Sequence, residues 1–206
     1  MFSIRWWIIL SNYVYLLVLM LVFNTYLKKK VGEGLGGHRK IPKNLRVIFF
    51  FGFIGAWIIT LFPIIFLFYP NIVNISFPIP IFQKLIFEIF GISITILGVL
   101  IITISIIQLG TSARFLLPKQ KTKLVTSGVY RFSRNPLYIG AYLVFIGLFL
   151  LLPSIIYLIG LFLFFILQHF RILQEEQFLK DTFGVEYENY MKKVGRYFPK
   201  IHKNKE

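Results

Sequence analysis

Two polar stretches stand apart from an otherwise hydrophobic chain. The first, TKLVTSGVYRFSRNPLY, runs from Thr122 to Tyr138, and the second runs from Arg171 to Pro199. Carboxylates in the second stretch could accept hydrogen bonds from a diol or offset a positive amino group. Arg171, at its start, could hold a carboxylate through two donors. We therefore interpret the two stretches as two walls of one active site at a membrane surface.

The charged residues at the start of the second stretch leave two interpretations open: structural ion pairs, or a site that receives a cationic or polyhydroxylated ligand. Arg171, Glu175 and Glu176 follow a hydrophobic segment, where buried charge is costly unless it pairs or binds something polar. Arg171 and Glu175 share a helical face, although an arginine before a glutamate is the less favourable order. Glu176 and Lys180 have the better order, so an ordinary surface pair would account for Glu176.

The end of the first stretch has the pattern of a helix start. Pro136 is favoured at the first position of a helix, which makes Asn135 a natural N-cap. Gly128 permits a tight turn before it. On spacing alone, a capped helix with Arg134 extended to the membrane surface explains this pattern.

The composition is that of an integral membrane protein. Of the 206 residues, 57% are hydrophobic, against about 45–50% in soluble domains. The formal net charge is +15, but the basic residues crowd the ends of apolar segments. This placement argues against nucleic-acid binding and favours attraction to anionic lipid headgroups. No cysteine is present, and His38, His169 and His202 are too scattered to suggest a metal site.

Apolar segments predict an all-α protein with about five transmembrane helices. Three spans are expected at Trp6–Leu27, Val47–Tyr69 and Leu85–Leu109, with Glu88 as a water-facing acid near the end of the third. The segment 137–170 would measure about 51 Å as one helix, beyond a hydrocarbon core of about 30 Å. Because Pro153 breaks it, we expect a re-entering hairpin. One tilted span is the alternative, and it would separate the two polar stretches across the membrane.

The distribution of charge predicts the orientation. The loop 28–46 has seven basic residues and one acid, and the stretch 110–134 has six basic residues, so both are expected in the cytoplasm. The amino terminus would then lie outside, with the carboxy terminus and a cofactor pocket in the cytoplasm. The lack of an organelle-retention signal favours a prokaryotic plasma membrane.

One membrane domain is expected over residues 1–206, with three scaffold spans in 1–109 and a catalytic half in 110–206. In the tail, Gly184 should end the last long helix. The apolar side chains after it recur at helical spacing, which predicts a short amphipathic helix on the bilayer or over the site. They are Tyr187, Tyr190, Met191 and Val194.

Together, the segments LVTSGVYRFSRNPLYIG and RILQEEQFLKDTFGVEYENYMKKVGRYFP resemble the carboxy-terminal half of isoprenylcysteine carboxyl methyltransferases and related membrane methyltransferases. The resemblance covers roughly residues 122–199, with the order and spacing of both motifs kept. The broader superfamily includes phospholipid methyltransferases and, more remotely, steroid-type reductases.

The resemblance implies S-adenosylmethionine as cofactor, with Glu175 holding it. Arg171 and Glu176 would be the catalytic residues, Arg171 facing the substrate carboxylate and Glu176 supporting the cluster. Asn135 departs from the eukaryotic enzymes, which carry His there, so any step that depends on His is in question. The residues expected to line the cofactor are Thr122, Lys123, Leu124, Val125, Tyr130, Asn135, Pro136, Leu137 and Tyr138.

The leading hypothesis is methyl transfer to a lipophilic acceptor that enters from the bilayer, in particular carboxyl methylation of an isoprenylcysteine-like substrate. A phospholipid or other lipid methyltransferase is one alternative. A second is an NADPH-dependent lipid reductase, although Gly32, Gly34 and Gly37 lack the strand and helix of a dinucleotide site. The third is a non-catalytic lipid-binding membrane protein. The sequence does not indicate the oligomeric state.

Overall fold

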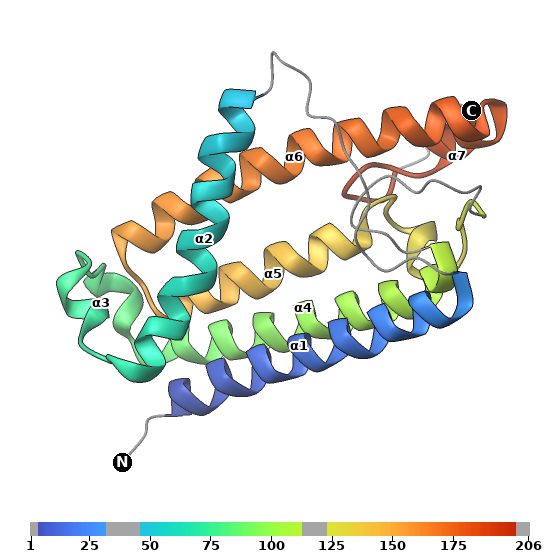
Figure 1. Cartoon of the computed structure of the whole chain (residues 1–206). Coiled ribbons are helices and arrows are strands. Elements are labelled where there is room, and N and C mark those ends of the chain that lie inside the picture. The colour runs from blue at the N-terminus through green and yellow to red at the C-terminus, as the bar shows by residue number, and fades with distance from the viewer. Residues whose placement is uncertain (1–3, 32–45, 113–122, 201–206) are drawn as a thin grey trace.

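The computed structural model describes residues 4–31, 46–112 and 123–200, and every element of regular structure in these ranges is helical (Figure 1). Pro78 and Ser154 form an isolated bridge. The α-helices are α1 (Ile4–Val31), α2 (Arg46–Phe68), α3 (Ile72–Ile75), α4 (Leu85–Leu109), α5 (Pro136–Leu151), α6 (Ile155–Phe183) and α7 (Val185–Lys193). Three 3₁₀ turns, η2 (Pro80–Gln83), η3 (Gly110–Ser112) and η4 (Gly128–Arg131), lie between them.

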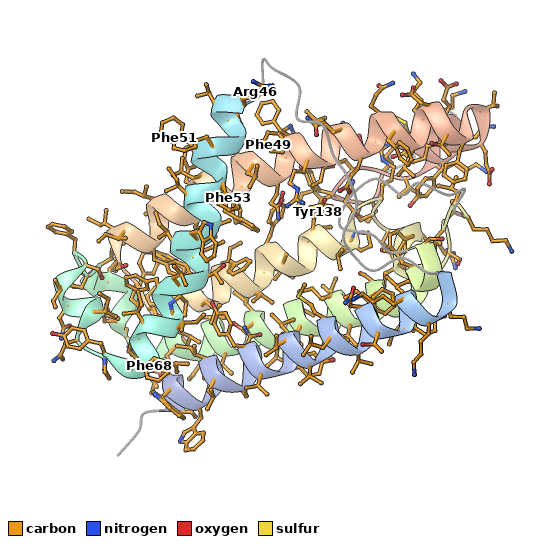
Figure 2. All side chains as sticks on the ribbon, in the orientation of Figure 1. Arg46, Phe49, Phe51, Phe53, Phe68 and Tyr138 are labelled. Carbon is orange, nitrogen blue, oxygen red and sulfur yellow. The ribbon has the colours of Figure 1, made fainter. Side chains whose placement is uncertain are left out.

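Four helices in the described ranges, α1, α2, α4 and α6, are long and apolar enough to cross a membrane. With 16 residues, α5 is shorter than the roughly 20 residues that a full crossing needs. The prediction of an all-helical, multi-pass membrane protein is therefore confirmed, with four candidate spans. Figure 2 shows Phe51 and Phe68 pointing away from the bundle, and both side chains are exposed, as expected of a lipid-facing surface.

The predicted break at Pro153 is present, because α5 ends at Leu151 and α6 begins at Ile155. The hydroxyl of Ser154 caps α6 by accepting a hydrogen bond from the Tyr157 amide at 3.2 Å. The connector before α4 holds this turn: the Ile79 amide donates to the Pro153 carbonyl at 3.1 Å. The Ile155 amide donates to the Phe77 carbonyl at 2.9 Å. The turn is therefore fixed at a buried end of the bundle.

Two glycine-lined seams bring helices into close contact. Where α4 packs on α5, a Cβ atom added at Gly98 would lie 2.7 Å from the Gly140 carbonyl oxygen. Where α2 packs on α6, a Cβ atom at Gly55 would lie 2.7 Å from the Gly160 carbonyl oxygen. Only glycine allows backbones to approach this closely, a device common between membrane helices. The two seams thus join α5 to α4 and α6 to α2.

Polar contacts attach α1 to the bundle. The Trp6 indole donates to the Leu67 carbonyl at 2.8 Å, and the Tyr13 hydroxyl donates to the Thr60 carbonyl at 3.0 Å. Arg5 forms an ion pair with Glu88 at 2.9 Å, and the Glu88 side chain is only 13% exposed. The prediction of a water-facing Glu88 was wrong, because an arginine 83 residues away pairs with the acid and offsets its burial.

From the turn, α5 and α6 diverge, and the loop 123–135 and α7 lie near their far ends (Figure 1). Gly184, with φ of 52°, ends α6 as predicted and leads directly into α7. The start of α5 and the end of α6 belong to the two polar stretches, so the fold brings both stretches to the same end of the molecule.

Candidate active site

The two polar stretches meet through a pair of glutamates on α6. The Tyr138 hydroxyl, on the first turn of α5, donates to Glu175 Oε1 at 2.6 Å. Figure 2 shows Tyr138 at the start of α5, between α5 and α6. Glu176 forms an ion pair with Arg134 at 2.8 Å. Neighbouring acids on α6 therefore contact residues close together in the first stretch.

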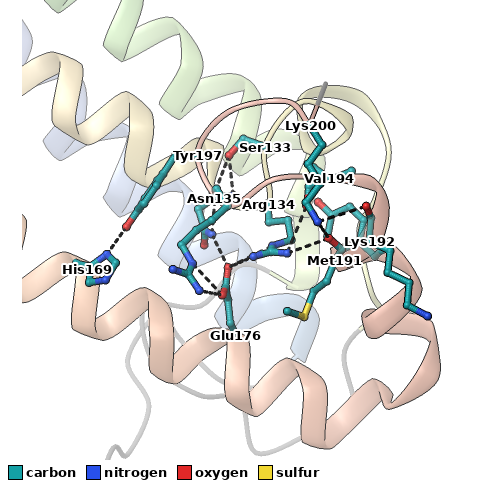
Figure 3. A network of polar contacts seen from close by, with 12 residues as sticks. Ser133, Arg134, Asn135, His169, Glu176, Met191, Lys192, Val194, Tyr197 and Lys200 are labelled. Carbon is teal, nitrogen blue, oxygen red and sulfur yellow. Dashed lines mark hydrogen bonds and ion pairs between the residues drawn. The ribbon is translucent and has the colours of Figure 1, made fainter. Parts of the chain in front are cut away.

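Glu176 is the centre of a buried polar cluster (Figure 3). The residue is 6% exposed, and each of its carboxylate oxygens faces one guanidinium. Arg134 donates from Nη2 and Nε to Oε1 at 2.8 and 3.2 Å. Arg196 donates from Nη2 and Nε to Oε2 at 2.8 and 3.0 Å. We call Glu176, Arg134, Asn135 and Arg196 the Glu176 clasp.

In the clasp, two positive guanidinium groups compensate the buried negative carboxylate of Glu176. The hydrogen bond to Glu176 raises the pKa of Arg196, which keeps that guanidinium charged. The Asn135 amide nitrogen adds a third donor to the carboxylate at 3.3 Å. Both oxygens of Glu176 are thus held within the protein.

A short segment after α7, residues 194–200, crosses the loop before α5, and we call it the tail strap. The Arg134 amide donates to the Gly195 carbonyl at 3.0 Å, and the Ser133 hydroxyl donates to the Arg196 carbonyl at 2.9 Å. Lys200 donates from Nζ to the Met191 carbonyl at 2.6 Å. The strap is therefore attached on one side to the loop and on the other to α7.

Asn135 occupies the N-cap position of α5 with Pro136 after it, as predicted, but its side chain makes no capping hydrogen bond. Its amide nitrogen instead donates to Glu176 and to the Arg196 carbonyl, each at 3.3 Å. The expectation that the asparagine side chain caps the helix was wrong, because the clasp uses the amide group.

The predicted amphipathic pattern after Gly184 is confirmed in α7. Tyr187 and Tyr190 of α7 and Val194 directly after it are buried, and the half-buried Met191 and Leu124 pack against them. The Tyr190 hydroxyl donates to the Tyr130 carbonyl at 2.6 Å. Burial raises the pKa of the Tyr190 phenol, so it stays protonated and available as the donor. The apolar face of α7 therefore covers the loop.

The remaining predicted cofactor residues differ in exposure. Thr122 lies outside the described residues. Lys123 is exposed, Leu124, Val125 and Leu137 are half-buried, and Pro136 is buried. Tyr130 is also buried, and burial raises the pKa of its phenol.

Arg171 and Glu175 lie one turn apart on α6, and both side chains are half-buried. Arg171 Nη1 donates to the Gln168 side chain at 3.4 Å. The surface pair between Glu176 and Lys180, which the spacing allowed, is absent: Lys180 pairs with Glu188 at 3.3 Å. Glu176 instead points towards the loop before α5 and the tail strap, where it pairs with Arg134 and Arg196.

Sequence reasoning missed four contributors to the site. Arg134 was expected to extend to the membrane surface, but its side chain is only 7% exposed and belongs to the clasp. Arg196 stands in the quoted GRYFP segment without an assigned role, and the need of a buried glutamate for a countercharge was the signal that could have found it. Ser133 anchors the strap. Gln108, at the end of α4, accepts from the Val129 amide at 2.8 Å and fixes the η4 turn.

Beside the polar groups lies an open, apolar pocket of about 350 Å³, which we call the aromatic pocket. Tyr142 stands one turn beyond Tyr138 on α5, and Phe170 adjoins Arg171 on α6. Nδ1 of His169 lies 2.8 Å from the Tyr197 hydroxyl, which joins α6 to the tail strap (Figure 3). The lining residues are Tyr142, Phe165, Ile166, His169, Phe170 and Tyr197.

The chain is similar in sequence to several known proteins. Residues 86–186 match the phospholipid methyltransferase family model. The protein-S-isoprenylcysteine O-methyltransferase of Schizosaccharomyces pombe is 33% identical over 102 residues, 47% of this chain and 43% of the relative. That of Saccharomyces cerevisiae is 36% identical over 116 residues, 54% and 48% of the two chains.

The protein-S-isoprenylcysteine O-methyltransferase B of Arabidopsis thaliana is 34% identical over 110 residues, 51% of this chain and 55% of the relative. The chain spans about half the length of the curated relatives it matches. The matches confirm the resemblance indicated by the two motifs. Residues 86–186, which run from α4 into α7, are similar to the phospholipid methyltransferase family, and the curated relatives that the chain resembles are isoprenylcysteine O-methyltransferases.

Proposed function

We propose that the protein is an S-adenosylmethionine-dependent membrane methyltransferase that methylates the carboxylate of a lipophilic, isoprenylcysteine-like acceptor. The observation that carries the proposal is that Glu175, held by Tyr138, lies one turn from Arg171, which directly follows Phe170 of the aromatic pocket. A carboxylate for the donor, a guanidinium for the acceptor and an apolar surface for a hydrocarbon chain then lie side by side. The names of the relatives support the reaction class.

The residues present fit S-adenosylmethionine by the chemistry of their groups. The Glu175 carboxylate can accept hydrogen bonds from a ribose diol or face a positive amino group. The Tyr138 hydroxyl, 2.6 Å from Glu175 Oε1, orients it. Residues 123–126 belong to neither helix nor strand, so their backbone groups add further donors and acceptors. When bound, S-adenosylmethionine would supply a methyl group on a positive sulfur, which transfers to an ionised carboxylate without moving a proton.

Arg171 is the residue we assign to the acceptor carboxylate. It lies one turn from Glu175 on α6 and next to Phe170 of the aromatic pocket. Its guanidinium can hold a carboxylate through two donors and keep it ionised. A carboxylic acid with a pKa of about 4 is already ionised at neutral pH, so the site needs alignment and exclusion of water more than a base. The presence of Asn135 rather than a histidine is compatible with this chemistry.

We assign Glu176 a positioning role rather than contact with the reacting atoms. Both of its oxygens are held by Arg134 and Arg196. Through Arg134 and Asn135 it fixes the start of α5, and hence Tyr138, against α6. This arrangement supports the predicted supporting role of Glu176 within the catalytic cluster.

We also propose that α5 and α6 form the re-entering hairpin, with the site on the cytoplasmic face. The meeting of the two polar stretches at one end supports the hairpin, because a single tilted span would separate them. The basic residues at the end of α1, Lys28, Lys29 and Lys30, support the cytoplasmic side and contact with anionic lipids. The donor would then enter from the cytoplasm and the acceptor from the bilayer.

The direct test is methyl transfer by detergent-purified protein from labelled S-adenosylmethionine. N-acetyl-S-farnesylcysteine offers a carboxylate, whereas phosphatidylethanolamine vesicles offer an amine, the substrate class suggested by the family description. We expect label in a base-labile methyl ester of the farnesylcysteine. Label in the phospholipid alone would overturn the carboxylate acceptor, and label in neither would overturn the proposed function.

A further inference from the structure

The aromatic pocket is built from three distant parts of the chain. Tyr142 comes from α5, the segment Phe165–Phe170 from α6, and Tyr197 from the tail strap. The Tyr142 ring lies 4.6 Å from that of Phe165 and 6.3 Å from that of Tyr197, measured between centroids. Two helices and a non-helical segment thus supply the walls of the pocket.

The pocket adjoins the groups that we assign to the reaction. Tyr142 follows Tyr138 by four residues, so both side chains lie on one face of α5. Phe170 directly precedes Arg171 on α6. A molecule with its carboxylate at Arg171 can therefore place an attached hydrocarbon chain against the aromatic walls.

Tyr197 is held in place by polar contacts on both sides. Its neighbour Arg196 is bound to Glu176 through its side chain and to Ser133 and Asn135 through its carbonyl. Its own hydroxyl lies 2.8 Å from Nδ1 of His169. This contact occupies the Tyr197 hydroxyl and one ring nitrogen of His169, which lowers the cost of placing that wall against an apolar ligand.

We propose that the aromatic pocket holds the hydrocarbon chain of the acceptor and that Tyr197, fixed by His169, is the residue that determines which chain length is accepted. The inference rests on the proposed function, whose acceptor it specifies. A volume of about 350 Å³ falls within the range of about 300–1,000 Å³ typical of ligand pockets. The aromatic lining contains no formally charged residue, as an isoprenoid chain requires.

The occupant is an acceptor chain rather than the donor because the walls lack the groups that the donor needs. S-adenosylmethionine carries an amino group, a carboxylate and a diol, which require charged or hydrogen-bonding partners. Those partners, Glu175 and Tyr138, lie on the adjoining side of the site. The Tyr197 hydroxyl and Nδ1 of His169 contact each other.

The test uses acceptors that differ only in their isoprenoid chain, N-acetylcysteine carrying S-geranyl, S-farnesyl or S-geranylgeranyl groups. Tyr197→Ala removes the wall, so we expect the Kd and KM for the farnesyl compound to rise about tenfold. The preference among the three compounds should shift towards the longest chain, while the KM for S-adenosylmethionine changes by less than about twofold. Phe198→Ala is the matched control, because Phe198 neighbours Tyr197 on the strap and is 80% exposed.

A second variant keeps the test decisive where Tyr197→Ala fails to fold. Ile166→Phe narrows the pocket from α6 without touching the strap. It should weaken binding of the geranylgeranyl compound most and the geranyl compound least. Unchanged ranking of the three chains in both variants, or equal loss of donor and acceptor affinity, would overturn the inference.

Acceptor binding is measured without donor, by titration of the three compounds into purified protein, so that the two proposals can fail separately. If Tyr197→Ala shifts the chain ranking but wild-type protein binds no S-adenosylmethionine, the pocket assignment holds and the methyltransferase proposal fails. If S-adenosylmethionine binds and the ranking does not move, the pocket assignment fails alone.

Discussion

The two ends of α5 and α6 are held together by different physics. At the turn end, buried apolar side chains pack the helices together, and Leu151, Leu152 and Tyr157 are fully buried. At the site end, the helices diverge and a buried glutamate joins the loop and the tail strap to α6 through two arginines. Close packing thus leaves no space for a ligand at the turn end, whereas ion pairs at the site end fix the residues around an open site.

This contrast predicts that loss of a clasp residue damages function and stability together, whereas a substitution in a glycine seam damages stability alone. Packing of apolar surfaces is distributed over many small contacts. A buried charge cluster fails when one member is removed, because the remaining charges lose their partner.

The largest effect is expected from Glu176→Ala. Arg134 and Arg196 would face each other without the carboxylate, at a cost of about 3–5 kcal/mol in the free energy of unfolding. The rate of methyl transfer should fall together with stability, because the clasp no longer fixes Tyr138 against α6. The measurement is thermal unfolding in detergent, followed by activity below the unfolding temperature.

Glu188→Ala is the matched control, since its ion pair with Lys180 is close to half-exposed on both sides. Exposed pairs contribute at most about 1 kcal/mol. Equal stability of the two variants would show that the Glu176 clasp does not hold the site end together.

A smaller effect is expected in the seam from Gly98→Ala. The added methyl group would lie 2.7 Å from the Gly140 carbonyl oxygen, so α4 and α5 must separate, at a cost of about 1–3 kcal/mol. The protein that remains folded should keep its KM for both substrates. Ile96→Ala, on the exposed face of α4, should change stability less. A Gly98→Ala protein of wild-type stability would contradict the close approach of the two helices.

Arg171→Ala tests the acceptor side of the site. Losing a guanidinium that holds the acceptor carboxylate should raise the acceptor KM about tenfold, which corresponds to about 1.4 kcal/mol. Donor affinity should change little, because Glu175 and Tyr138 remain. Steady-state kinetics with both substrates varied separates the two constants. A rise in the donor KM alone would move Arg171 to the donor side.

The smallest effect is expected from Tyr190→Phe. The variant keeps the buried ring but removes the hydrogen bond to the Tyr130 carbonyl, worth about 1 kcal/mol. We expect a modest loss of stability with activity nearly retained. Loss of activity out of proportion to stability would show that the Tyr130 carbonyl must be held for catalysis.

Local features of the fold could be predicted from the sequence. The bounds of α4, the break at Pro153 and the helix end at Gly184 follow from runs of apolar residues and from the backbone preferences of proline and glycine. The buried face of α7 follows from helical spacing. Each of these depends only on neighbours within one or two turns.

The partners of buried charges could not be predicted in this way. Glu176 pairs with Arg134, 42 residues away, and with Arg196, 20 residues away, whereas spacing along the helix pointed to Lys180. Glu88 likewise pairs with Arg5 from another helix. Such pairs depend on how helices are arranged in space, which the spacing of residues within one helix does not determine. The roles of Arg171 and Glu175 towards ligands, and the division of the chain at residue 110, stay predictions.

The central claim is that the site end binds a methyl donor through Glu175. Calorimetric titration of detergent-purified protein with S-adenosylmethionine, S-adenosylhomocysteine and NADPH tests it most directly, with Glu175→Gln as the variant and Glu188→Ala as the control. We predict saturable binding of the first two compounds to wild-type and control protein, weakened about tenfold or more in Glu175→Gln. Binding of NADPH alone, or binding of S-adenosylmethionine that is unchanged in Glu175→Gln, would contradict the claim.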